Sequence, residues 1–95
     1  MADVHVAQSP VMGAGAPLYS GHFEGETISG GAAGSLEFKG AGFAMRVTAT
    51  TGASYVRLTT ATSTASSAAN AAYLAEGTSI DLYGTAGDVV RQDDA

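Results

Sequence analysis

Phe43-Ala44-Met45-Arg46-Val47-Thr48-Ala49-Thr50 is the stretch of this chain that decides its fold. Larger apolar side chains alternate along it with small or polar ones, and successive side chains of a β-strand point to opposite faces of a sheet. The face that carries Met45 and Val47 is therefore predicted to be buried. The face that carries Arg46 is predicted to meet solvent. The stretch thus predicts a strand with one buried face and one wet face.

Other segments with extended character lie on both sides of this strand. The predicted strands are 3–7, 18–28, 36–39, 43–51, 55–58, 73–74, 80–83 and 89–92. We expect three hairpins among them, which pair 36–39 with 43–51, 43–51 with 55–58, and 73–74 with 80–83. A short helix over 67–76 is the alternative for part of the low-complexity segment. About six to eight short antiparallel strands with turns every ~8–12 residues predict an all-β fold, either a small β-sandwich or a partly open barrel.

The chain of 95 residues is long enough for one domain. Ser9-Pro10 and the Gly/Ala/Pro run 13–17 interrupt regular structure near the start of the chain. We therefore expect residues 1–17 to form an extended N-terminal arm, or an edge strand, followed by a loop. Residues 18–95 are expected to form the single β domain.

The composition predicts a small core. Ala, Gly, Ser and Thr supply more than half of the chain, whereas Leu, Ile, Val and Phe together supply a little under a fifth. Small side chains each bury little apolar area, at about 25 cal/mol per Å². A lone monomer of this composition is expected to be marginally stable. We therefore expect it to pack against copies of itself or against a larger body.

Charge and patterning argue against two classes of partner. The net charge is −5, and the only cations other than histidine are Lys39, Arg46, Arg57 and Arg91, which are scattered, so a nucleic-acid partner is not expected. No apolar run approaches the ~20 residues that span a bilayer, and the first residues lack the pattern of a signal peptide. We expect a soluble protein that is made in a cytoplasm. Cysteine is absent, which excludes disulfides and thiol chemistry.

Residues that carry chemistry are sparse, and we do not expect an enzyme, a cofactor or a metal. Gly13-Ala14-Gly15 and Gly40-Ala41-Gly42 lack the third glycine of a nucleotide fingerprint and are interpreted as turns. His5 and His22 are interpreted as exposed side chains rather than metal ligands. The sequence leaves one acid/base or calcium alternative, in which the carboxylates of Glu24, Glu26 and Asp81 meet across a sheet. The simpler interpretation is a charged face that protects an edge strand.

A resemblance follows from the order of several motifs. They are 43–50 with its Arg-Val step, Tyr55-Val56-Arg57-Leu58, Ala61-Thr62-Ser63-Thr64, Leu74-Ala75-Glu76-Gly77-Thr78 and Gly87-Asp88-Val89-Val90, together with the opening Ala2-Asp3-Val4-His5-Val6-Ala7. This order resembles small virion structural proteins of tailed bacteriophages, of the head decoration or cement type. The likeness covers most of the chain and is a pattern of small residues without a catalytic signature.

The resemblance implies a protein on the outer surface of the phage capsid that binds the assembled head shell. Its partner would be the major capsid protein, and a homo-oligomer is expected, with a trimer on a symmetry axis favoured. We expect the N-terminal arm to order on its neighbour. The residues predicted to bind the partner are Val4, His5, Val6, Val11, Met12 and Tyr19.

The alternative function belongs to a different class. A tail, spike or fibre protein could bind carbohydrate on a host surface through its tyrosines, because an aromatic ring stacks on a sugar face. The candidates are Tyr19, Tyr55, Tyr73 and Tyr83. The same side chains also suit half-buried strand positions or subunit contacts.

Overall fold

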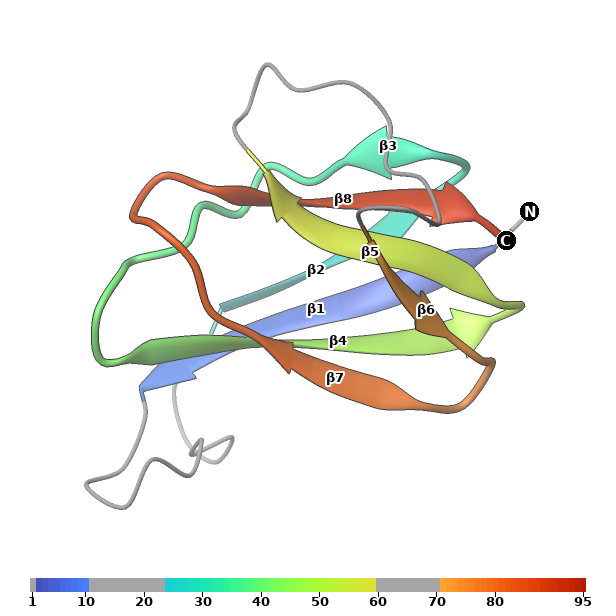
Figure 1. Cartoon of the computed structure of the whole chain (residues 1–95), viewed down its shortest axis with the longest axis horizontal. Coiled ribbons are helices and arrows are strands. Elements are labelled where there is room, and N and C mark those ends of the chain that lie inside the picture. Colours follow the sequence, from blue (N-terminus) through green and yellow to red (C-terminus); the bar gives the residue numbers. More distant parts are fainter. Residues whose placement is uncertain (1, 11–23, 60–70) are drawn as a thin grey trace.

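The computed structural model describes residues 2–10, 24–59 and 71–95. They form two four-stranded sheets that lie face to face (Figure 1). One sheet has the order β2-β1-β4-β7, with β1 Asp3–Pro10, β2 Glu24–Ser29, β4 Phe43–Thr51 and β7 Ser79–Leu82. The other has the order β3-β8-β5-β6, with β3 Ala32–Ala33, β5 Ser54–Thr59, β6 Ala72–Leu74 and β8 Val89–Asp94. The predicted all-β sandwich of short antiparallel strands is confirmed.

From Met45 onward strand β4 carries the alternation that its sequence predicts, whereas Ala44, on the face predicted to meet solvent, is fully buried. Met45, Val47 and Ala49 are fully buried, while Arg46 and Thr48 between them are only half-buried. The strand pairs with β1 over its length and with β7 from Met45 to Thr48. It therefore lies inside its sheet and presents one apolar face to the opposite sheet.

The core lies between the two sheets. Strands β1 and β4 contribute Val4, Val6 and Met45 from one side, and β5 and β8 contribute Val56 and Val90 from the other. The other buried residues of the cluster are Ile28, Phe38, Val47, Ala49 and Leu74. Most of these side chains are small or medium in size, as the composition predicts. Within residues 2–10, 24–59 and 71–95 the chain forms no helix that is long and apolar enough to cross a bilayer.

The predicted N-terminal arm is wrong for Asp3–Pro10. This segment is β1, an interior strand that hydrogen-bonds to β2 on one side and to β4 on the other. The physical reason is burial, because Val4 and Val6 are both fully buried against the opposite sheet. Pro10 ends the strand and has no partner on β2 among the described residues, so no ladder bond described on that side requires its missing N–H. Residues 11–17 and the predicted domain boundary lie outside the described residues.

The three predicted hairpins are also wrong in their pairing. Strand β4 belongs to one sheet and β5 to the other, so the turn at Gly52 is a crossing between layers, and Gly52 has the left-handed φ of 67° that this crossing uses. Strands β6 and β7 are likewise in different sheets. The segment 36–39 does not pair with β4; instead Phe38 exchanges backbone hydrogen bonds with the 87–88 segment, at 2.8 and 2.7 Å.

The remaining predictions for single elements have mixed outcomes. The final strand is confirmed as β8, and the second predicted strand is confirmed over residues 24–28 as part of β2, with its residues 18–23 outside the described part of the chain. The alternative helix over 67–76 is contradicted at its end, because Ala72–Leu74 is strand β6. Residues 67–70 lie outside the described residues.

Candidate functional site

Of the residues predicted to bind a partner, the structure describes Val4, His5 and Val6, and among these only His5 is exposed. Val4 and Val6 are fully buried in the core, which removes them from any contact with a partner, so this part of the prediction is wrong. His5, between them, is exposed on the outer face of the sheet. The predicted contacts Val11, Met12 and Tyr19 lie outside the described residues.

The carboxylates of the acid/base alternative are kept apart by the topology. Strands β2 and β7 are opposite edges of their sheet, with β1 and β4 between them, so Asp81 is remote from the two glutamates. Asp81 instead forms a two-pronged ion pair with Arg46, at 2.9 and 3.2 Å. Glu26 accepts hydrogen bonds from the backbone amides of Ser35 and Leu36, at 3.0 and 2.8 Å. Among the described residues no three His, Asp or Glu side chains gather as a metal site.

The first surface with an exposed aromatic side chain is the outer face of the β3-β8-β5-β6 sheet. Tyr73 is 59% exposed, and its ring meets that of Tyr55 edge to face at 5.7 Å. In the register of the sheet Tyr55 lies opposite both Tyr73 and Asp93, and Asp93 pairs with Arg91 at 3.3 Å. We call Tyr55, Tyr73, Arg91 and Asp93 the tyrosine face. It combines one accessible ring with a neighbouring charged pair.

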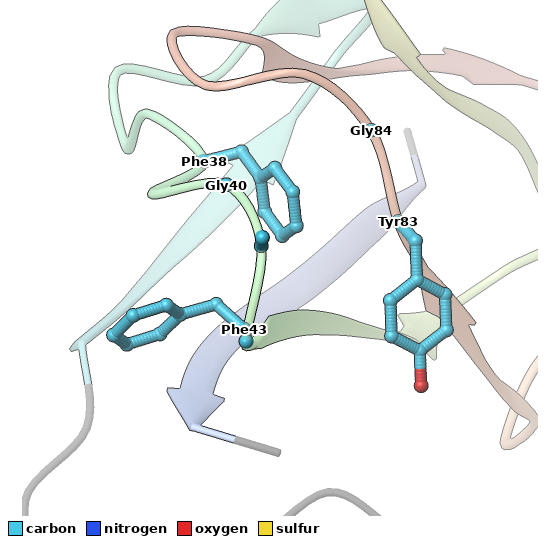
Figure 2. Close-up of a pocket in the computed structure, with 7 residues that line it drawn as sticks. Phe38, Gly40, Phe43, Tyr83 and Gly84 are labelled. Carbon is cyan, nitrogen blue, oxygen red and sulfur yellow. The ribbon is translucent and has the colours of Figure 1, made fainter. Parts of the chain in front are cut away.

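The second surface is a pocket at the end of the sandwich, with a volume of about 210 Å³. In Figure 2 Phe38, Gly40 and Phe43 lie on one side of it, and Tyr83 and Gly84 lie on the other. Tyr83 is 57% exposed, whereas Phe38 belongs to the core. We call this site, which Ala41 and Gly42 complete, the end pocket. Its walls are mainly apolar.

The end pocket exists because β4 and β7 separate. Their pairing ends at Met45 and Leu82, although β4 continues to Phe43. The chain after Leu82 leaves the sheet and crosses to the other layer, where it becomes β8 (Figure 1). The start of β4 is therefore left without a neighbouring strand on its β7 side among the described residues.

Backbone directions show which groups face this gap. The N–H and the carbonyl of Ala49 bond to Thr78 and Gly77, which places Ala49 toward the β7 side. Alternate residues of an antiparallel strand point the same way, so the backbone of Phe43 also points toward β7. Its N–H donates to the Gly40 carbonyl at 3.2 Å. No described residue donates a hydrogen bond to the Phe43 carbonyl.

Charges around the end pocket are mostly negative. The Lys39 ammonium lies 2.7 Å from the Glu24 carboxylate and 6.0 Å from the centre of the Phe43 ring, so its charge is neutralised by Glu24. The Asp88 carboxylate accepts a hydrogen bond from the Thr85 amide at 3.0 Å, next to Gly84. The rim of the pocket therefore carries an excess of carboxylate.

Sequence reasoning singled out Tyr83 but missed Phe38 and Phe43 as pocket residues. The sequence signal for the pocket is a pair of phenylalanines, Phe38 and Phe43, on the two sides of Gly40-Ala41-Gly42. On sequence alone, this glycine triplet is interpreted only as a turn. Gly40 and Gly42 have φ of 105° and 88°, a left-handed backbone that favours glycine. The turn interpretation is consistent with this backbone, but the pocket depends on the later departure of β7.

The structure places the chain in the class of small all-β sandwiches, with two surfaces that expose aromatic side chains. Comparison of the chain with protein-family models, with curated proteins and with solved structures found no match.

Proposed function

We propose that this chain is a non-catalytic head decoration (cement) protein that binds the assembled shell of a tailed-phage capsid and stabilises contacts between its subunits. The observation that carries the proposal is the end pocket, an apolar site that the described part of the domain leaves unfilled. Apolar pockets with aromatic walls are typical binding sites on small domains. The sequence resemblance to virion structural proteins supports the same role.

The proposed mechanism is stabilisation by selective binding. A protein that binds the assembled shell, and not its free subunits, lowers the free energy of the assembled state by RT ln(1 + [L]/Kd) for each site. Many sites on a closed shell multiply this contribution. A trimer around a capsid symmetry axis is the proposed oligomer, because closed cyclic symmetry repeats one contact without leaving a free end. The proposed location is the outer surface of the virion.

A second candidate function is supported by the tyrosine face. The ring of Tyr73 is well exposed and is held by Tyr55, which suits stacking on a sugar ring. The neighbouring Arg91 and Asp93 can hydrogen-bond to hydroxyl groups. These features support a tail, spike or fibre module that binds host carbohydrate.

Two tyrosines of nearly equal exposure separate the two functions. We expect Tyr83→Ala to weaken binding to shells assembled from the major capsid protein, and we expect Tyr73→Ala to bind like the wild type. Loss of binding in Tyr73→Ala alone, or attachment to host glycans without attachment to shells, would favour the carbohydrate function. The number of copies per particle is a second readout. A fixed simple ratio to the major capsid protein fits decoration, and a few copies fit a tail or spike.

A further inference from the structure

We infer that the end pocket receives an extended segment of the shell subunit, which inserts one large apolar side chain and pairs its backbone with the open edge of β4 at Phe43. This inference rests on the proposed decoration function and specifies the chemistry of the contact. The occupant is thus a strand-like peptide with an apolar residue and basic neighbours. Three independent features of the pocket define these properties.

The open edge of β4 indicates that the peptide in the pocket has an extended backbone. The Phe43 carbonyl points toward the side from which β7 has departed, and it receives no hydrogen bond from the described residues. A free strand edge is satisfied by another strand, because main-chain hydrogen bonds give affinity and alternate side chains fill neighbouring pockets. An incoming backbone N–H would satisfy the carbonyl where the β7 ladder stops. The pocket lies at the same position, between Phe43 and Gly84.

The volume of the pocket limits the size of the side chain that the shell peptide inserts. A space of about 210 Å³ lies below the ~300 Å³ at which pockets for drug-sized ligands begin. It exceeds the ~150 Å³ cavity that takes up benzene. One aromatic or branched apolar side chain therefore fits it. The walls formed by Phe38, Phe43 and Tyr83 supply the matching apolar contacts.

The charge of the rim defines the residues that flank this side chain. Lys39 is neutralised by Glu24, while the Asp88 carboxylate beside Gly84 leaves this side of the rim negative. The whole chain also carries a net charge of −5. Charge complementarity at an interface speeds association and fixes the partner. The segment of the shell subunit is therefore basic on at least one side of its apolar residue.

The experiment blocks the pocket and measures binding to shells of the major capsid protein. Ala41 lines the pocket, is exposed and has an ordinary φ, so Ala41→Phe can be accommodated and places a ring at the mouth. Ala75→Phe makes the same change at an exposed turn remote from the pocket. We expect Ala41→Phe to raise the Kd at least about tenfold and Ala75→Phe to leave it unchanged. Equal binding by both variants overturns the inference.

Two further measurements keep the test decisive if Ala41→Phe unfolds. Asp88→Asn removes the rim charge, keeps an acceptor oxygen and is expected to weaken binding at low salt. Glu76→Gln, which removes a charge from a turn elsewhere, is expected to leave binding unchanged. A photo-crosslinking amino acid at position 41 is expected to capture a shell peptide with an apolar residue beside Lys or Arg. The same crosslinking amino acid at position 75 is the control. Capture of a shell peptide from position 75 but not from position 41 overturns the inference. Wild-type protein that does not bind shells at all overturns the decoration function itself, while binding that ignores the pocket overturns only this inference.

Discussion

At the scale of single residues, two buried glutamines close the two ends of the sandwich. Gln8, on β1, donates to the Glu37 carbonyl at 3.1 Å and accepts from the Lys39 amide at 2.8 Å. Gln92, on β8, accepts from the Gly31 amide at 2.9 Å and donates to the Ser54 hydroxyl at 3.0 Å. Each amide connects a strand to the backbone of a loop. A buried amide contributes most when every partner is satisfied, because an unpaired buried polar group is costly.

Replacement of Gln92 tests this role. Gln92→Ala leaves the fully buried Ser54 hydroxyl and the half-buried Gly31 amide without their partner, so we expect the free energy of unfolding to fall by about 2–4 kcal/mol. Urea unfolding measures the change. Thr27→Ala, at an exposed position of β2, is the control and is expected to cost less than about 0.5 kcal/mol. Similar losses in both variants would show that the buried amide has no special role.

The hydrogen bonds to the Asp94 carboxylate are expected to make the free energy of unfolding depend on pH. The Gln92 side chain and the Ala2 amide donate to its carboxylate, at 3.0 and 3.1 Å, and these hydrogen bonds hold the pKa of Asp94 below its ordinary value of 3.8. The folded chain therefore binds this proton less readily than the unfolded chain. The stabilising contribution is complete above the unfolded pKa and is lost as the pH falls through the lower folded value. In urea unfolding below about pH 4, Asp94→Asn should show a shallower loss of stability than the wild type, and identical slopes would contradict the prediction.

At the scale of elements, alternation predicts the buried face of a strand but not its partner. Along β4 the period of two follows from burial of one face, and it identifies Met45 and Val47 correctly as core. The choice of a neighbour depends on how the whole sandwich closes, which is a matter of contacts distant in sequence. The short connection at Gly52 suggested a hairpin, yet the chain uses it to change sheets. The end pocket escaped prediction for the same reason, because it depends on where β7 leaves β4.

Two of the connections that change sheets are joined to each other, and this contact is testable. The Glu76 carboxylate accepts a hydrogen bond from the Gly52 amide at 3.1 Å, which links the β6–β7 connection to the β4–β5 connection. We expect Glu76→Ala to lower the free energy of unfolding by about 1 kcal/mol. Glu76→Gln keeps an acceptor oxygen and should retain most of this stability. Equal losses in thermal or urea unfolding would show that the charge, and not the hydrogen bond, matters.

At the scale of the whole molecule, the proposed decoration role makes shell stability depend on the concentration of this protein. Stabilisation by binding amounts to about 2.7 kcal/mol per site when the free protein is at a hundred times its Kd. We expect the temperature at which purified shells come apart to rise steadily as wild-type protein is added. Tyr83→Ala, which removes one wall of the end pocket, should shift this curve to higher concentration. Tyr73→Ala should leave it in place, because the tyrosine face is not part of the proposed contact. Shells whose thermal stability does not change across the concentration range would contradict the role, whatever the protein binds elsewhere on the particle.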